Sequence, residues 1–282
     1  MERRVSQLAP VLLLLVPIIA CGSVATNDGV VFESDWSTAT GTSRRTVTDG
    51  GRWRHYDEWN HGSGVQLLSV VTGGPGGRNA LRVMQRGSTY AAALQQDNVL
   101  PPSTDFYVRF YMRNDDTSPG GDHIVVSGIY SWEQFTYIRR LTTATTWRNS
   151  NNISSCGSWT YPIGHWYGRR ALTNGQWYRF EYYFHYVDAT HMQVHQRIYD
   201  ASGALIMTDA DIQQEDYGSA VWNGSNTWTL ASYYAAGNSF CVNPTKMTSF
   251  SVGNNGQLGA ADTGLSWYFA GVQIRTDRWA GP

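Results

Sequence analysis

Two histidines, an amide and a guanidinium recur at every second position of one short stretch, HMQVHQRIYD (residues 191–200). In a β-strand, alternate side chains point to the same face of the sheet. One face would then be apolar, and the other would carry His191, Gln193, His195 and Arg197. An imidazole can remove a proton, while guanidinium and amide groups can neutralise a carboxylate beside it. These residue types therefore suit proton abstraction next to a carboxylate.

Two earlier segments show the same alternation, and they would have to lie beside this stretch to complete a site. Residues 105–113 (DFYVRFYMR) and 176–186 (QWYRFEYYFHY) each have one apolar face. Their other faces carry Tyr107, Arg109, Tyr111 and Arg113, and Trp177, Arg179, Glu181, Tyr183 and His185. The turn-like VDAT joins the second segment to residues 191–199 and predicts a hairpin. If all three strands share a sheet, their polar faces converge.

The composition agrees with an all-β protein. The chain has 282 residues, of which 41% are apolar and 15% are charged, and its net charge is −1. That balance is typical of a globular domain and argues against nucleic acid as the main partner. Further strands are expected at 123–130 and 266–275, with Gly-, Asn- and Pro-rich turns between the strands and no linker after residue 30. We therefore predict one antiparallel β-sandwich over residues 30–282.

The N-terminus is typical of an exported protein. The basic MERR precedes an apolar stretch that is too short to span a membrane comfortably, and the stretch ends in IIAC, which resembles a bacterial lipobox. We predict a signal peptide (1–20), lipidation at Cys21 and a tether (21–29), so that the lipid alone anchors the protein at the cell surface or in the periplasm. The alternative is an ordinary cleaved secretory signal. Cys156 and Cys241 would then form a disulfide or stay as two buried thiols, and a metal site is not predicted because no CxxC spacing occurs.

Four segments together resemble bacterial concanavalin A-like lectin/glucanase domains: LPPSTDFYVRFYMR, GQWYRFEYYFHY, FSVGNNG and WYFAGVQIRTDRWAGP. The resemblance covers about residues 30–282. It implies two curved sheets in a jelly roll, with a polysaccharide in the groove of the concave sheet. The hydrolases of this superfamily carry an ExDxxE pattern, which is missing here, and the acidic DADIQQED (209–216) is typical of a solvated turn. Ala270-Gly271 stands where relatives commonly have Asp.

Jelly-roll alginate lyases use a Gln-x-His pair, an Arg on an earlier strand and a Tyr near the C-terminus. Gln193-Val194-His195 reproduces the pair, and the segment YYAAG (233–237) is similar to the family's YFKAG, with Ala235 in place of Lys and Ser239 where the Tyr would follow. Tyr111, Tyr183 or Tyr233 would therefore have to donate the proton. Our hypothesis from the three polar faces and this resemblance is that His195 is the base, that Tyr183 is the donor, and that Gln193, Arg109 and Arg197 hold the carboxylate. Further substrate contacts are expected from Tyr111, Arg113, Glu181, His185, His191, Tyr233, Trp159 and Trp166.

We thus predict a lyase that cleaves an acidic, uronate-containing extracellular polysaccharide by β-elimination. The first alternative is a lectin-like surface module, because aromatic rings stack on sugars. Seven tryptophans in turn-like contexts could do so or could instead pack over the sandwich: Trp53, Trp59, Trp132, Trp147, Trp159, Trp166 and Trp222. The second alternative is a structural or adhesive lipoprotein whose polar residues do not converge. We expect a monomer without a cofactor; Asp-rich turns leave room for a structural calcium ion but assign no ligands.

Overall fold

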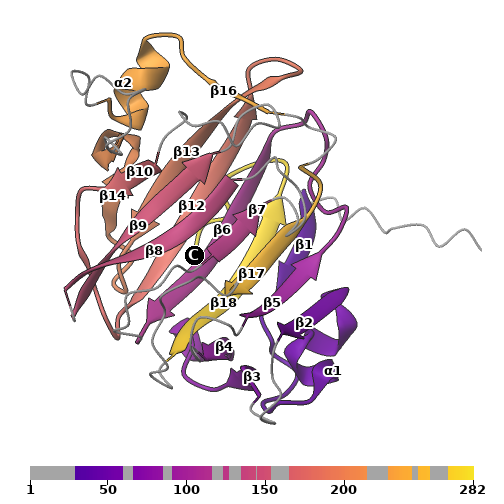
Figure 1. The fold of residues 1–282 in the computed structure, drawn as a ribbon. Coiled ribbons are helices and arrows are strands. Elements are labelled where there is room, and N and C mark those ends of the chain that lie inside the picture. Colours follow the sequence, from indigo (N-terminus) through magenta and orange to yellow (C-terminus); the bar gives the residue numbers. More distant parts are fainter. Residues whose placement is uncertain are drawn as a thin grey trace, which may run out of the picture.

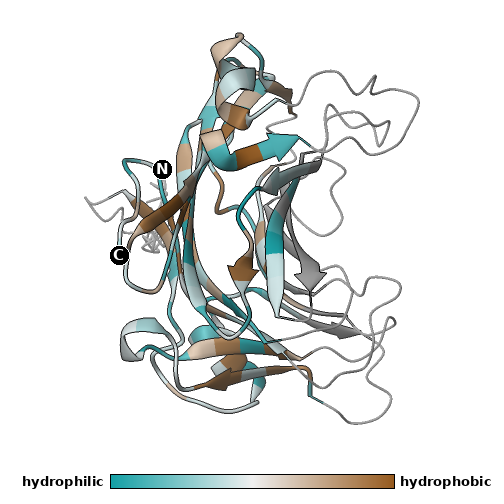
Figure 2. Cartoon of the chain, turned by 90° about the vertical axis from the view of Figure 1, so that its left-hand side faces the viewer, coloured by the Kyte–Doolittle hydropathy of each residue, from teal (hydrophilic) through white to brown (hydrophobic). Residues whose placement is uncertain are grey.

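The chain folds into two antiparallel β-sheets that pack face to face (Figures 1 and 2). The structure is a computed structural model. It describes residues 29–59, 66–84, 91–115, 123–126, 135–143, 145–153, 165–214, 228–242, 247–254 and 266–282. The prediction of an all-β sandwich is confirmed. In these ranges, no helix is long and apolar enough to cross a membrane.

Sheet A contains the three strands that the polar pattern singled out. Its order is β14 (Leu205–Thr208), β13 (His191–Tyr199), β12 (Trp177–Tyr186), β6 (Phe106–Asn114), β18 (Ser266–Arg275), β4 (Ala80–Met84) and β3 (Leu68–Val71). In addition, β1 (Val30–Ser34) pairs with β18, and β16 (Phe240–Cys241) pairs with β13. The predicted hairpin is confirmed, with Tyr183 directly opposite His195.

Sheet B forms the other layer. Its order is β15 (Ile212–Gln214), β10 (His165–Gly168), β9 (Thr146–Ile153), β8 (Phe135–Thr143), β7 (His123–Val126), β17 (Phe250–Asn254), β5 (Ala91–Gln96) and β2 (His55–Trp59), and β11 (Leu172–Thr173) pairs with β9. Short helices connect strands: α1 (Arg44–Val47), η1 (Asp49–Gly51), η2 (Pro75–Gly77), η3 (Asp209–Asp211) and α2 (Leu230–Ala235). The predicted strand at 123–130 is described only as far as Val126.

Stacked aromatic rings fill the space between the sheets. The rings of Phe106 and Phe184 lie 4.5 Å apart, and those of Phe110 and Phe180 lie 5.2 Å apart, so cross-strand pairs of β6 and β12 form the centre of the core. All four are at most 1% exposed. Burial of each such ring stabilises the fold by about 1.5–3 kcal/mol. The apolar half of the period-two pattern thus faces sheet B.

One buried polar cluster joins the sheets inside this core. Gln196 of β13 accepts hydrogen bonds from Asn151 (2.8 Å) and Asn149 (3.4 Å) of β9 and donates one to the hydroxyl of Tyr182 (3.1 Å). All four residues are at most 2% exposed. Because buried amides are costly without partners, this cluster fixes how β13 lies against β9.

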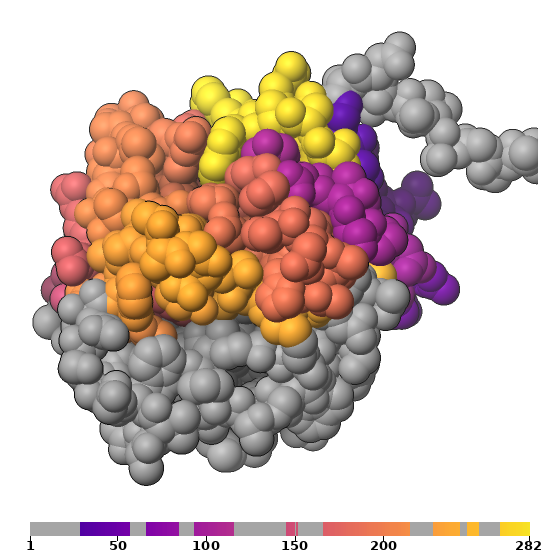
Figure 3. All heavy atoms as spheres, turned by 90° about the horizontal axis from the view of Figure 1, so that it is seen from above, coloured from indigo at the N-terminus to yellow at the C-terminus, as the bar shows by residue number. Residues whose placement is uncertain are grey.

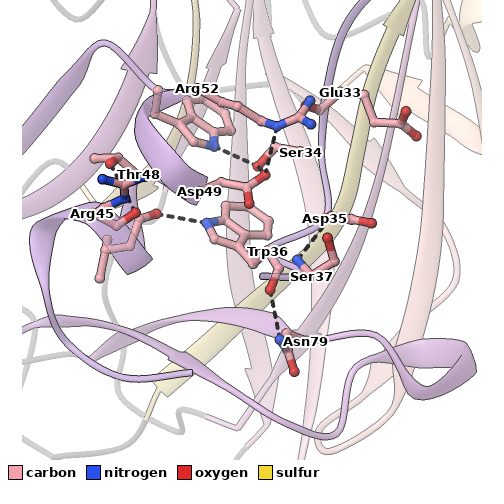
Figure 4. A network of polar contacts seen from close by, with 12 residues as sticks. Glu33, Ser34, Asp35, Trp36, Ser37, Arg45, Thr48, Asp49, Arg52 and Asn79 are labelled. Atoms are coloured by element: carbon pink, nitrogen blue, oxygen red, sulfur yellow. Dashed lines mark hydrogen bonds and ion pairs between the residues drawn. The ribbon is translucent and has the colours of Figure 1, made fainter. Parts of the chain in front are cut away.

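A second polar network closes the N-terminal end of the sandwich (Figure 4). The indole of Trp53 donates to Ser34 (2.8 Å), whose hydroxyl donates to the buried carboxylate of Asp49 (2.9 Å). Trp36 donates to the carbonyl of Val47 at 2.8 Å and stacks on Trp53 at 6.1 Å. These bonds hold α1 and η1 against β1.

Three of the tryptophans considered for sugar stacking are part of the core. Trp53, Trp147 and Trp166 are 1%, 0% and 0% exposed. Trp166 was expected to contact substrate, and that expectation is wrong because its ring packs against Phe240 (5.9 Å) and Tyr233 (5.4 Å). Trp132, Trp159 and Trp222 lie outside the described residues.

Candidate functional site on sheet A

The polar residues of β6, β12 and β13 lie on one face of sheet A, which we call the polar face. Directly opposed residues of an antiparallel pair point to the same side. The register forms one row from Tyr107, Tyr183 and His195, and a second row from Arg109, Glu181 and Arg197. The structure therefore brings together five residues that were predicted to have catalytic or binding roles: Arg109, Glu181, Tyr183, His195 and Arg197. Their apolar neighbours along each strand face sheet B.

The last residues of the chain cross this face, and we call residues 276–282 the C-terminal segment. Arg109 donates to the carbonyls of Gly271 (3.2 Å) and Gly281 (3.1 Å) and is 5% exposed. The guanidinium of Arg197 lies 4.1 Å from the ring centre of Trp279. Figure 3 shows the yellow C-terminal part of the chain at the surface. A substrate would reach Arg109 only if this segment moved.

A buried charge cluster lies beneath the segment. Glu181 is 2% exposed and pairs with Arg179, whose Nε lies 3.1 Å from Oε1. Burial raises the pKa of Glu181, although Arg179, Arg197 and Arg109 oppose the shift, as does the backbone N–H of Gly281. Burial likewise lowers the pKa of Arg109. Glu181 thus neutralises guanidinium groups within the protein and was expected, wrongly, to be open to a ligand.

His195 and Asp209 form a dyad at the accessible end of the polar face. Nδ1 of His195 lies 2.6 Å from Oδ2 of Asp209, and the other carboxylate oxygen accepts the backbone N–H of Gln196 at 2.7 Å. The side chains of His195 and Asp209 are 27% and 19% exposed. With Nδ1–H donated to the carboxylate, Nε2 keeps the lone pair that a general base needs. Asp209 therefore holds the imidazole in the orientation that a general base at this position would need.

Tyr183 stacks beside His195 and holds a second carboxylate. The two ring centres lie 5.6 Å apart, and the hydroxyl of Tyr183 donates to Oδ2 of Asp105 at 2.5 Å. The same oxygen lies 2.9 Å from Nδ1 of His185, and Oδ1 of Asp105 accepts the N–H of Tyr186. Two histidine–aspartate pairs thus flank one tyrosine.

The protonation of this end of the face follows from these contacts. Burial and the hydrogen bond to Asp105 raise the pKa of Tyr183, so its hydroxyl stays protonated. Burial alone would raise the pKa of Asp105, but hydrogen bonds from Tyr183, His185 and Tyr186 outweigh it and lower that pKa. Tyr183 is therefore a neutral phenol that donates to Asp105, and it is unsuited to be a base.

The remaining predicted residues are mostly engaged by the chain itself. Gln193 donates to the carbonyl of Asn238 (3.0 Å), and His191 pairs with Asp188 in an exposed turn (3.0 Å). Two predicted residues of β6, Tyr111 and Arg113, lie toward β18. Tyr111 is 9% exposed. Arg113 pairs with Asp115 and lies 4.1 Å from the ring centre of Tyr268.

Sequence reasoning missed two partners of His195. Asp209 was assigned to a solvated turn, but η3 brings it back onto β13, and no local pattern in the sequence signals this contact. Tyr234, rather than the predicted Tyr233, packs 5.0 Å from the His195 ring and bonds both backbone groups of Val194. Tyr233 instead packs against Trp166 and Phe240, because α2 turns the two tyrosines in different directions.

Two other predictions are not decided by these contacts. Cys156 lies outside the described residues, so its disulfide with Cys241 of β16 stays a prediction. In the described part of the chain, no three His, Cys, Asp or Glu side chains gather closely enough to hold a metal ion.

Comparison with known proteins supports the fold. No protein-family model and no curated protein matches the chain. Among solved structures it is similar to the marine PL-14 alginate lyase from Aplysia kurodai, with a TM-score of 0.56 and 12% identity over 88% of this chain and 99% of that one. It is also similar to the alginate lyase Aly36B, with a TM-score of 0.50 and 13% identity over 88% and 97% of the two chains. At such identities the likeness shows the fold alone, a concanavalin A-like jelly roll, as predicted.

Proposed function

We propose that the protein is an exported polysaccharide lyase that cleaves a uronate-containing glycan by β-elimination on the polar face of sheet A. The observation that carries the proposal is the dyad of His195 and Asp209 beside the protonated hydroxyl of Tyr183. A base and a proton donor on neighbouring strands are the two groups that such an elimination needs.

In the proposed reaction, Nε2 of His195 takes the proton from the carbon next to the uronate carboxylate. The electron pair of that C–H bond forms the new C=C bond while the bond to the leaving glycosidic oxygen breaks. Tyr183 gives its hydroxyl proton to that oxygen. Arg197, whose guanidinium lies over Trp279, is the proposed partner of the carboxylate and would stabilise the charge that develops on it.

A second candidate function is sugar binding without catalysis, and a specific observation favours it. Arg109 is held by carbonyls of the chain, and the proton of Tyr183 already points to Asp105. Trp279, Tyr107 and Tyr183 form an aromatic cluster, with Trp279 edge-on to Tyr107 at 5.5 Å. Such a cluster can contact a sugar ring whether or not a bond is cleaved.

The proposal also concerns location and partners. We propose lipidation of Cys21, a disulfide between Cys156 and Cys241, and a monomer that meets an acidic extracellular polysaccharide. Mass spectrometry of the protein purified from its membrane would show the lipid on Cys21. A mature chain that starts at another residue and lacks the lipid would contradict this part of the proposal.

The decisive experiment uses the chain from residue 22 onward. It would be incubated with alginate, glucuronan, heparin and pectin, and the ultraviolet absorbance of new unsaturated uronates would be followed. We expect a rise that His195→Ala abolishes while thermal unfolding stays cooperative. Arg278→Ala, which changes an exposed residue of the C-terminal segment, should keep the activity. Absence of product from all four polymers would refute the lyase, and retained binding to any of them would support the second candidate.

A further inference from the structure

Five polar side chains form a row across the polar face of sheet A, and the middle of this row is buried. The register places them opposite one another on β1, β18, β6, β12 and β13, in that order: Glu33, Gln273, Arg109, Glu181 and Arg197. We call these five residues the charged row. Gln273, Arg109 and Glu181 are 8%, 5% and 2% exposed. Because burial of ionised groups costs free energy, a face that served packing alone would carry apolar residues at these positions.

The C-terminal segment lies on the charged row and is held there by few described contacts. The carbonyl of Gly281 accepts a hydrogen bond from Arg109 at 3.1 Å, and the N–H of Gly281 donates to Glu181. The ring centre of Trp279 lies 4.1 Å from the guanidinium of Arg197. The segment itself forms no helix or strand. It could therefore lift off the row without breaking any hydrogen bond between strands.

Two buried acceptor atoms of the charged row have no hydrogen-bond donor in the described part of the chain. The first is Oε1 of Gln273, whose Nε2 donates to Glu33 at 3.1 Å. The second is Oε1 of Glu181, which lies 3.1 Å from Nε of Arg179 in an ion pair that lacks hydrogen-bond geometry. A buried acceptor without a donor is destabilising. A ligand that brings hydroxyl groups would supply the missing donors.

The charged row offers the groups that an acidic sugar unit requires. The planar fork of Arg109 suits a carboxylate, and its described hydrogen-bond partners are two backbone carbonyls. Neighbouring strands are about 4.8 Å apart, so the acceptors of Gln273 and Glu181 flank Arg109 within reach of the hydroxyl groups of one sugar ring. Tyr183 and His195 lie two residues further along the same strands, about 7 Å away. A uronate bound here would be next to the unit that is cleaved.

We propose that the charged row is a second uronate-binding subsite, and that the C-terminal segment is a built-in cover which an acidic oligosaccharide displaces. Arg109 then exchanges the carbonyl of Gly281 for the carboxylate of the sugar. Glu181 exchanges the N–H of Gly281 for a sugar hydroxyl, and Gln273 accepts a second one. The inference rests on the proposed function for its ligand class and for the cleavage beside it. It adds a subsite and a control step, because substrate has to compete with the chain's own segment.

Equilibrium binding tests the cover. Every variant of the chain from residue 22 onward also carries His195→Ala, so that no probe is cleaved. The probes are oligomannuronate and oligoguluronate, with a cello-oligosaccharide of equal length as the neutral control. Deletion of residues 279–282 should tighten binding of the acidic probes about tenfold, because the hydrogen bond from Arg109 to Gly281 no longer competes. Arg278→Ala, which changes an exposed side chain just before the deleted residues, should leave the affinity unchanged.

Gln273→Leu tests the subsite rather than the cover. The change removes one of the two acceptors that lack a donor. In the chain without residues 279–282 it should weaken binding of the acidic probes about fivefold, the effect of one hydrogen bond. Gln176→Leu, which changes an exposed glutamine just before β12, is the matched control and should not alter the affinity. With cooperative thermal unfolding in both variants, an unchanged affinity in Gln273→Leu would overturn the subsite.

Hydrogen exchange follows the segment itself. When the acidic probe is added to the chain with its segment intact, the amides of residues 279–281 should lose protection, since the N–H of Gly281 leaves Glu181. A gain of protection, or weaker binding after the deletion, would overturn the inference. The outcomes separate the two proposals. Tighter binding after the deletion without any elimination by the parent chain refutes only the lyase, whereas elimination with no change in affinity after the deletion refutes only this inference.

Discussion

Asp209→Asn is the sharpest test of how the polar face works, because the change is nearly isosteric. Oδ1 of Asp209 accepts the N–H of Gln196, so the oxygen of an asparagine has to stay there and its NH₂ group has to face His195. An NH₂ group donates to Nδ1 rather than accepting from it. The imidazole proton would then move to Nε2, the atom that should take the proton from the substrate.

The two consequences differ greatly in size. The rate should fall about 10²- to 10⁴-fold, the usual contribution of a positioned general base. The free energy of unfolding should fall by only about 1 kcal/mol, since one hydrogen bond loses its charge, and the melting temperature by about 2–4 °C. The variant should therefore be folded and nearly inactive.

The measurement is the initial rate of ultraviolet absorbance increase on whichever polymer the parent chain cleaves, beside a thermal melt of each variant. Asp211→Asn is the matched control. Asp211 lies in the same short helix but bonds Thr208 rather than His195, so its loss should cost similar stability and keep the rate. An Asp209→Asn variant with the parent's rate would show that His195 is not the base.

Three further predictions concern stability. Trp279→Ala removes an edge-on ring contact with Tyr107 and the cation–π contact with Arg197. The free energy of unfolding should fall by about 2 kcal/mol and the melting temperature by about 4–8 °C. The control Arg278→Ala should lower the melting temperature by less than half as much. Gln196→Leu leaves buried Asn151 without its acceptor and should cost about 1–3 kcal/mol in a denaturant titration; a neutral result would mean that water replaces the amide. The pKa of Asp105 is lowered in the folded state, so this carboxylate stabilises the fold above the unfolded-state pKa near 3.8, and the stabilisation is lost as the pH falls below that value. Asp105→Asn should therefore flatten the decline of the melting temperature in this acidic range. A decline parallel to that of the parent chain would contradict the prediction.

The sequence was sufficient for the strands because their period of two reflects a physical need. Residues 176–186 and 191–199 each have to bury one side and expose the other, so the alternation predicts both the hairpin and the residues that share a face. What covers that face is a different matter. The C-terminal segment has no periodicity, and its contact with Arg109 is made by one backbone carbonyl, that of Gly281, a group that every residue type carries.

The candidate site was predictable in part for the same reason. His195, Tyr183 and Arg197 could be placed together from register alone. Asp209 could not, because its contact depends on how the chain turns after β14, and no local pattern sets that turn. Trp166 shows the reverse case: a tryptophan between turn-like residues carries no mark of burial until the packing of Phe240 and Tyr233 is known.

The start of the described chain has a consequence for how the protein would stand on a membrane. The carbonyl of Gly29 accepts the N–H of Thr276 at 2.9 Å, so the tether leaves the domain where the C-terminal segment begins, at the end of β18 in sheet A. If Cys21 carries the lipid, the seven residues 22–28 span at most about 25 Å. Gly29 and the end of β18 would then stay within that distance of Cys21, so the domain would work close to the bilayer.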